Sequence, residues 1–274
     1  VVPFARYVNV GTAARGQSWL SVPADATSTT NQCWVEDQGG YCSATQTVTS
    51  TCYNDGVPYA CSWEQCTNWV SGKLVTVCGP VTTTTAWHGC VGSRKYPNDL
   101  QAEANVTSPV PGVMDEVCNA QLVRLTQDQT ALAVAIDGLA AWDETYIAPG
   151  MLWAWRVLSP RQPFADGSSN TQTTKKAIIL MTDGFNTVSA TYPNHWGGDT
   201  ADSNAVLSKT CANAKAEGIA VYTIAFQVSD STVKSILTGC ATNASYFFDS
   251  GNIAQMQAAF KQIGSQLSSR RLVY

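Results

Sequence analysis

The second half of the chain alternates between short apolar runs and amphipathic segments. The apolar runs are residues 177–182 (AIILMT), 219–226 (IAVYTIAF) and 246–249 (YFFD). Continuous apolar runs of this length are typical of strands buried on both faces, as the strands of parallel sheets are. We therefore expect three parallel strands in this half of the chain.

Helices are expected between and around these strands. The segment 199–217 places apolar residues along one face and ends at Gly218, and a shorter helix is expected at 233–237. Another helix is expected to begin near Pro149 and to end before Pro160, because proline is tolerated only in the first turn. The last helix is indicated by apolar residues three or four positions apart, at Ile253, Met256, Phe260, Ile263 and Leu267.

Two further elements complete the pattern. Residues 1–10 read as a strand, and Thr126 with Gln129 forms a capping-box signature at the start of a helix. Alternating strands and helices predict an α/β fold, with a Rossmann-like, doubly wound and mostly parallel sheet. The inward face of the helix after Thr126 is expected to carry Leu132, Ala135, Ile136 and Leu139.

Residues 13–121 have a different composition, dominated by Thr, Ser, Gly and Cys, and no helical period persists. We expect an inserted, disulfide-rich β or loop module here, with the α/β domain formed by residues 1–12 and 122–274. The pairing of its eight cysteines stays open. Its tryptophans form either a small core or an exposed aromatic patch for a glycan or a protein partner, and they are Trp34, Trp63, Trp69 and Trp87.

Composition excludes some classes of protein. Charged residues make up 13% of the chain and the formal net charge is -4, which excludes a nucleic-acid binder driven by bulk charge. No apolar stretch is long enough to cross a membrane. Ten cysteines without a CxxC pair, beside two histidines, favour disulfides over zinc thiolates or buried free thiols. We expect an extracytoplasmic protein whose export signal lies upstream of Val1.

Candidate chemistry lies directly after the strand at 177–182. Asp183 and Gly184 stand at the carboxyl end of that strand, where ligands of parallel sheets bind. This aspartate either caps the next turn or points its carboxylate into the crevice as a metal or catalytic group. Hydrolase motifs such as GxSxG and HExxH do not occur. His88 reads as structural, and His195 reads as a surface loop residue or a partner contact.

The segment KKAIILMTDGFNT resembles the fourth-strand motif of von Willebrand factor A (vWA) domains. ETYIAPGMLWAW resembles the threonine loop of that family and the helix after it, and VVPFARYVNVG resembles its second strand. The match covers residues 1–12 and 122–274. Within the family, VPFARYVNVG, WHGCVGSR, GMLWAWRVLSPRQPF and MTDGFNTV are most similar to TadG-type proteins of bacterial Flp/Tad pilus systems.

The resemblance implies a metal-ion-dependent adhesion site. Asp183 and Thr145 take the place of the family's metal ligands, and Gly184, Asn186 and His195 lie on the binding loop. Such sites hold Mg²⁺, with Mn²⁺ or Ca²⁺ as substitutes, because oxygen ligands suit hard dications. An acidic group of the partner then completes the coordination of the metal.

The resemblance also implies disulfides and a missing element. Cys211 is expected to pair with Cys240, and Cys90 with Cys118. The family's DxSxS strand would precede Val1, so metal binding by residues 1–274 alone is expected to be weak or absent. We expect an N-terminal segment or a partner strand to supply it.

The implied function is non-enzymatic binding or assembly in a Tad-type surface pilus. Pilin or other pilus-assembly subunits are the expected partners, and the periplasm, the outer cell surface or the pilus is the expected location. The alternatives are a secreted glycan-active or hydrolytic enzyme on an A-like scaffold, and another vWA adhesin.

Overall fold

The computed structural model describes residues 1–54, 57–118, 120–169 and 174–269. The chain forms two compact units, Ala26–Thr84 and the remainder, which comprises Val1–Asp25 and Thr85–Tyr274.

The smaller unit is shorter than the module expected at residues 13–121. Residues 13–25 and 85–121 belong to the α/β unit instead. The reason is burial, because Trp19 and Val91 pack with Trp153 in one core cluster of that unit.

A three-stranded parallel sheet lies at the centre of the α/β unit. Its order is β11 (Phe247–Ser250), β10 (Ala220–Phe226) and β9 (Ala177–Thr182). Ala220 of β10 aligns with Ala177, and Phe226 aligns with Ser250. The three apolar runs of the sequence are therefore parallel strands, each within one or two residues of its expected bounds.

Four helices surround this sheet. The helix α3 (Thr200–Ala216) connects β9 to β10, and α4 (Ser231–Cys240) connects β10 to β11. The helix α2 (Ile147–Leu158) packs against α3 and β9, and α5 (Ile253–Ser269) packs against β10 and β11.

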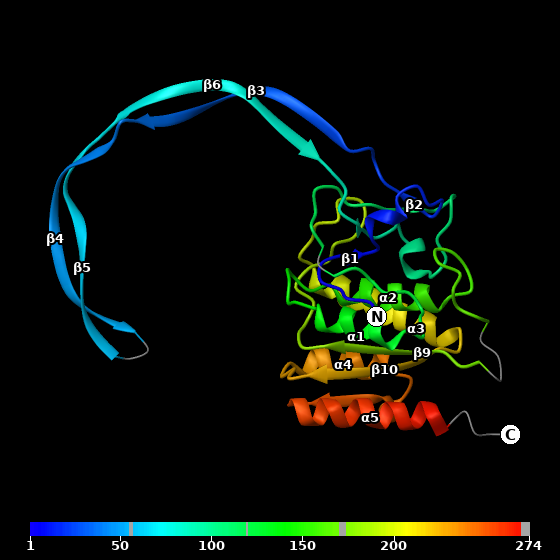
Figure 1. Ribbon diagram of the computed structural model, residues 1–274. Helices are drawn as coiled ribbons and strands as arrows, with labels where there is room; N and C mark the ends of the chain where they lie inside the picture. Colours follow the sequence, from blue (N-terminus) through cyan, green and yellow to red (C-terminus); the bar gives the residue numbers. More distant parts are fainter. Residues whose placement is uncertain (55–56, 119, 170–173, 270–274) are drawn as a thin grey trace. The chain divides into compact units, whose positions relative to one another are not determined.

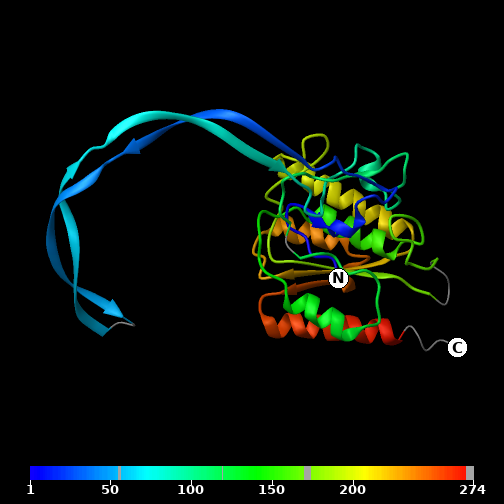
Figure 2. The same ribbon diagram turned by 45° about the horizontal axis from the view of Figure 1, so that its top comes forward.

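Helices cover both faces of the sheet (Figures 1 and 2). Val221 and Ala225 of β10 belong to a core cluster with residues of α2, α3 and α4. The intervening residues Tyr222 and Ile224 pack on the opposite face with Ile263 of α5. This alternation follows from the two-residue period of a strand.

The strand β9 is an edge strand, because no strand of the described residues pairs with its other side. Lys176 accepts a hydrogen bond from the backbone of Ala220, so the backbone groups of Ala177, Ile179 and Met181 face the open edge. The side chains of Ile179 and Met181 are 39% and 41% exposed. The doubly wound sheet expected from the sequence would continue past this edge.

The first ten residues do not join the sheet, so the strand expected at residues 1–10 is wrong for most of its length. Only Val8–Asn9 (β1) forms a strand, and it pairs antiparallel with Cys90–Val91 (β7). Pro3 has no backbone N–H to donate to a ladder, and residues 5–7 are bends. The segment still lies against α2, because Ala5 accepts a hydrogen bond from the backbone of Tyr146.

Short elements complete this unit. They are the parallel pair β2 (Leu20–Ser21) and β8 (Val110–Pro111), and the 3-10 turns η1 (Thr12–Ala14), η2 (Asn98–Leu100) and η3 (Ala244–Tyr246).

The helix α1 (Gln129–Asp137) exists, but its cap and its burial differ from expectation. Asp128 caps it by accepting a hydrogen bond from the backbone of Ala131, so Thr126 is not the N-cap. None of its residues is buried, and Ile136 is 52% exposed. The expected inward face has no layer against which to pack among the described residues.

The smaller unit is a two-stranded ribbon. The strand β3 (Ala26–Gln38) pairs with β6 (Lys73–Thr85), and β4 (Tyr41–Asn54) pairs antiparallel with β5 (Val57–Val70) (Figure 1). A ribbon of two strands has no interior and is marginally stable without other support. Disulfides link its strands, at Cys33–Cys78, Cys42–Cys66 and Cys52–Cys61.

The tryptophans of the ribbon do not form a small core. Trp34, Trp63 and Trp69 are 43%, 50% and 60% exposed. Trp87 is buried in the α/β unit, where its Nε1 donates a hydrogen bond to the carbonyl oxygen of Cys90. The small-core interpretation is therefore wrong, and the exposed-patch alternative agrees with the observed exposure of the other three.

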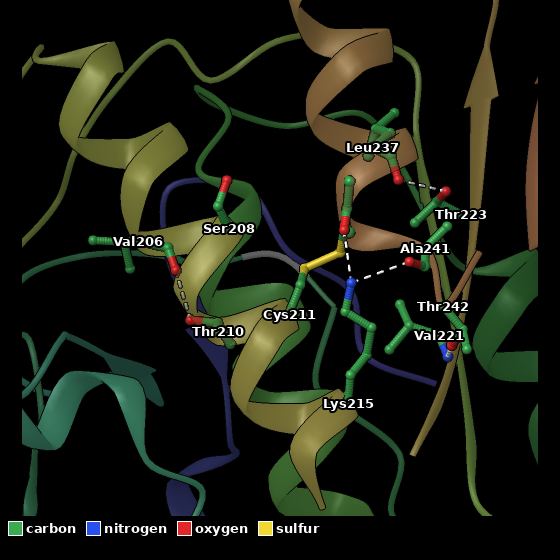
Figure 3. Close-up of a disulfide and its surroundings, with 12 residues drawn as sticks. Val206, Ser208, Thr210, Cys211, Lys215, Val221, Thr223, Leu237, Ala241 and Thr242 are labelled. Carbon is green, nitrogen blue, oxygen red and sulfur yellow. Dashed lines mark hydrogen bonds between the residues drawn. A yellow bond between two sulfur atoms is a disulfide. The ribbon is translucent and has the colours of Figure 1, made fainter. Parts of the chain in front are cut away.

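Two disulfides lie in the α/β unit, and they are the pairs that the resemblance implied. Cys211–Cys240 joins α3 to the end of α4 (Figure 3), and the other is Cys90–Cys118. Beside the first, Nζ of Lys215 donates hydrogen bonds to the carbonyl oxygens of Gly239 and Ala241. All ten cysteines are thus paired, which fits an oxidising, extracytoplasmic compartment.

No helix in the described ranges combines the length and the hydropathy that a membrane span requires.

Candidate functional site

A hollow of about 250 Å³ lies at the carboxyl end of β9. Asp183 and Thr145, the two expected metal ligands, both line it. The rest of its wall comes from the N-terminal segment, from the residues around the Cys90–Cys118 disulfide and from the loop before Thr145. These residues are Pro3, Phe4, Ala5, Tyr7, Asn9, Cys118, Ala120, Leu139, Ala140, Ala141, Trp142 and Asp143.

Asp183 follows β9 in a turn that another residue closes. The hydroxyl of Thr182 donates to the carbonyl oxygen of Gly184 at 3.1 Å and accepts from its N–H at 3.3 Å. Thr182 is buried, whereas Asp183 is exposed. The hydroxyl of Thr182 therefore closes this turn, and Asp183 is one of the residues that line the hollow.

Thr145 is held in place by the loop that follows Asp183. Its backbone N–H donates to the hydroxyl of Thr187 at 2.8 Å, and its carbonyl oxygen accepts from the backbone of Thr187 at 2.9 Å. This reciprocal pair fixes the residue at the entry to α2 beside the end of β9. Thr145 and Asp183 are distant in the sequence, and they meet because the loop after β9 is hydrogen-bonded to the backbone just before α2.

Asn186 orders the same loop from a buried position. Its Oδ1 accepts from the backbone N–H of Ile147 at 2.8 Å, and its Nδ2 donates to Oδ1 of Asn204 at 2.8 Å. Only 2% of Asn186 is exposed, so these bonds satisfy an amide that has no access to solvent. Asn186 therefore supports the loop after Asp183 from inside the α/β unit.

His195 lies inside the unit, which corrects its interpretation as a surface residue. Only 9% of it is exposed, its Nδ1 accepts from the backbone of Ser93, and its carbonyl oxygen accepts from the hydroxyl of Tyr7. Burial lowers the pKa of His195 and raises the pKa of Tyr7 to about 12. The histidine connects the loop after β9 to the segments around residues 7 and 93.

Sequence reasoning missed an ionic group at the hollow. Arg6 forms ion pairs with Asp143 at 3.3 Å and with Glu144 at 2.7 Å, and its guanidinium lies 4.3 Å from the ring centroid of Trp196. Asp143 lines the hollow beside Thr145. The adjacent acids just before Thr145 were the available signal in the sequence, but their arginine partner is 137 and 138 positions away.

Three exposed aromatic side chains follow Asp183 on the loop that leads to α3. Phe185 is 57%, Tyr192 49% and Trp196 64% exposed. Trp196 is joined to the hollow through Arg6 and Asp143. Aromatic residues such as these are enriched at surfaces that bind other proteins.

The oxygen donors of the hollow fit a hard dication only in part. Thr145 and Asp183 supply a hydroxyl and a carboxylate, and the carboxylate of Asp143 is held by Arg6. The described residues contain no group of three or more His, Cys, Asp or Glu that could hold a metal. Two donors leave most of an octahedral Mg²⁺ shell to water.

No protein-family model matches the chain, and no curated protein matches it. Among solved structures, the chain is similar to the pilus adhesin SpaC from Lactobacillus rhamnosus GG in its open conformation, at 15% identity and a TM-score of 0.40. That similarity covers 57% of this chain and 22% of the adhesin. The chain is also similar to proximal thread matrix protein 1 from the mussel byssus, in a structure with a zinc-occupied MIDAS motif, at 20% identity and a TM-score of 0.36. The second match covers 49% of this chain and 29% of the matrix protein.

Proposed function

We propose that this chain is a non-enzymatic binding protein of the TadG type, and that its vWA-like unit docks protein partners at the hollow. One observation carries the proposal, namely that Asp183 and Thr145 line the same hollow although they come from different elements. The resemblance of their two segments to vWA domains gives these residues their role.

The chemistry of the hollow supports binding more than catalysis. Asp183, Asp143 and Tyr7 are its described titratable side chains, and Cys118 is tied up in a disulfide. Neither histidine belongs to the described lining. A hydrolase would need an acid, base or nucleophile pair in hydrogen-bond reach at such a place.

The surroundings of the hollow support a protein as its partner. Phe185, Tyr192 and Trp196 supply exposed apolar area on the loop that follows Asp183, and the ion pairs of Arg6 supply charged groups beside Trp196. Aromatic residues and arginine are enriched at protein interfaces. A basic or metal-bridged acidic group of the partner would meet Asp183.

A divalent metal has a secondary place in this proposal. Thr145 and Asp183 would hold Mg²⁺ weakly, and Mn²⁺ or Ca²⁺ in its place, with water as the remaining ligands. When bound, the metal supplies a positive centre to which an acidic side chain of the partner coordinates. The side chains of this chain orient that contact, through the Thr145–Thr187 pair and the buried Asn186.

The open edge of β9 supports a strand as a further partner. The backbone of Ala177, Ile179 and Met181 faces this edge, and two of these side chains are exposed and apolar. An added strand would pair with those backbone groups and cover the apolar side chains. We propose that an N-terminal segment or a partner strand takes this place and carries the remaining metal ligands.

The Tad assignment rests on the resemblance of four segments to TadG-type proteins. It makes pilin or other pilus-assembly subunits the partners, and the periplasm, the outer surface or the pilus the location. The five disulfides agree with an oxidising compartment.

The proposal is tested by the affinity of the chain for purified pilin subunits from the same organism. The variants Asp183→Ala and Thr145→Val are expected to weaken binding at least about tenfold, or ~1.4 kcal/mol. The control Lys261→Ala, on the exposed side of α5, is expected to bind like the wild type. Equal affinity in all four proteins would reject the hollow as the docking site, and glycan hydrolysis by the wild type would favour the enzyme alternative.

A further inference from the structure

A second cavity lies in the α/β unit, between α2, α3 and the segment around Asp99. It measures about 20 Å³, and its polar wall comes from Ser93, Asp99, Tyr146, Arg156 and Thr210. A cavity that holds a water molecule needs roughly 10–15 Å³ and at least two polar partners. The volume therefore admits one small molecule and no more.

Asp99 is the member of this wall whose hydrogen bonding is incomplete. Only 7% of the residue is exposed, and its Oδ1 has no hydrogen-bond partner in the part of the chain that the structure describes. A buried carboxylate oxygen without a donor costs free energy, so such an oxygen normally has a donor that is not a protein atom.

Three cationic side chains attract Asp99 without forming an ion pair with it. Arg94, Lys209 and Arg156 all favour its ionised form, yet Asp99 takes no part in the ion pairs of the described residues. Arg94 donates instead to the carbonyl oxygens of Ser108 and Gln101, and Nε of Arg156 donates to that of Ala102. Asp99 and Arg156 carry opposite charges and line the same cavity without forming an ion pair, and a water molecule can bridge polar groups separated in this way.

We propose that this cavity binds one water molecule, which donates a hydrogen bond to Oδ1 of Asp99 and bridges it to Arg156. The charges of the wall select this ligand. The unpartnered carboxylate oxygen disfavours an anion, and the guanidinium group of Arg156 in the same wall disfavours a cation. A neutral molecule that both donates and accepts satisfies both kinds of group.

The bound water joins the segment around residues 93–102 to α2. Tyr146 in the wall is the residue directly after Thr145, and Arg156 lies in the last turn of the same helix. Burial raises the pKa of Asp99 and lowers the pKa of Arg156, so both charges depend on their polar neighbours. The water thus helps to fix the position of α2, which begins two residues after Thr145. This role does not depend on what the hollow binds.

The test is a high-resolution crystal structure of the wild-type chain, from crystals grown in sodium bromide. The expected result is one density peak in the cavity at about 2.7–2.8 Å from Oδ1 of Asp99, without anomalous signal at the bromide edge. An empty cavity, a direct Asp99–Arg156 ion pair or an anomalous peak from bromide would each overturn the proposal.

A solution measurement with two variants gives an independent readout. Oxygen-17 relaxation dispersion counts long-lived internal waters in the wild type, in Asp99→Asn and in Asp99→Leu. The asparagine keeps an acceptor and is expected to retain the wild-type number, whereas the leucine is expected to lose one water. A loss in Asp99→Asn, or an unchanged number in a folded Asp99→Leu, contradicts the proposal. Should Asp99→Leu fail to fold, Asp99→Asn and the crystal structure still decide it.

Discussion

The backbone N–H of Ile147 donates a hydrogen bond to Oδ1 of Asn186 at 2.8 Å, which ties the start of α2 to the loop after Asp183. Thr145 is two residues before the donor, and Asp183 is three residues before the acceptor. This buried bond therefore holds the two expected metal ligands at one hollow.

Replacing Asn186 by Ala removes this acceptor and leaves the buried N–H of Ile147 without a partner. The expected cost is about 1–3 kcal/mol of unfolding free energy, measured by urea denaturation. The control Asn204→Ala removes only the second hydrogen bond of Asn186 and is expected to cost about 0.5–1.5 kcal/mol. A larger loss in the control than in Asn186→Ala would show that the loop is held in another way.

The Cys211–Cys240 disulfide is expected to stabilise the α/β unit. It closes a loop of 29 residues, so replacing both cysteines by Ala should cost about 3–4 kcal/mol in the chain-entropy account. The matched control removes Cys52–Cys61 from the ribbon, which lies in the other compact unit. That change should leave the thermal unfolding of the α/β unit where it is, and an equal loss in both variants would show that the two units do not unfold separately.

The stability of the chain is expected to fall as the pH drops below the pKa of an unfolded histidine, ~6.5. Burial holds the pKa of folded His195 below that value, so the unfolded state binds the proton more readily. The contribution of His195 is present above pH ~6.5 and is lost as the pH falls through the folded pKa. Thermal unfolding between about pH 7.5 and 5 measures this loss.

Two histidine variants separate His195 from other titrating groups. His195→Asn should show a shallower fall, since asparagine tolerates the positive φ of 56° at this position. The exposed His88→Asn should keep the wild-type slope. If all three proteins show the same slope, His195 does not carry the pH dependence.

Metal binding by residues 1–274 alone is expected to be weak. Calorimetric titration with Mg²⁺ or Mn²⁺ should give dissociation constants of about 1 mM or more, because two oxygen donors leave most of the coordination to water. Asp183→Ala should remove the remaining signal, and Asp137→Ala, at the exposed end of α1, should not. Tight binding that survives Asp183→Ala would place the metal elsewhere.

Much of the α/β unit could be predicted from local patterns. The runs AIILMT, IAVYTIAF and YFFD became β9, β10 and β11, because an uninterrupted apolar run has few other places to be buried. The helix expected at residues 199–217 is α3, and its N-cap is Asp199. The local sequence of each of these elements is enough to indicate it, and its prediction depends little on distant residues.

Elements whose structure depends on a neighbour were not predictable in this way. Residues 1–10 have the composition of a strand, but only Val8–Asn9 pairs, and its partner is β7. The apolar positions of α1 indicate a helix correctly, yet none of its residues is buried by the part of the chain that the structure describes. In the ribbon, Thr, Ser and Cys occupy both exposed faces of the paired strands β4 and β5. The sequence therefore lacks the alternation of apolar and polar residues that would have indicated these two strands.

The candidate site shows the same division. The local motif around Asp183 and the segment around Thr145 each stand at an element boundary that the sequence marks, and both residues line the same hollow. The ion pairs of Arg6 with Asp143 and Glu144 join positions more than a hundred residues apart, and no local pattern encodes them. The burial of His195 likewise depends on Tyr7 and Ser93, which lie far away in the sequence.

The most direct test is a double-mutant cycle on Thr145→Val and Asp183→Ala, with affinity for purified pilin as the readout. If the two residues act as one docking site, each single change weakens binding and the double variant loses little more than the worse single variant. Losses that add in full, or no loss in any of the three variants, would contradict the account.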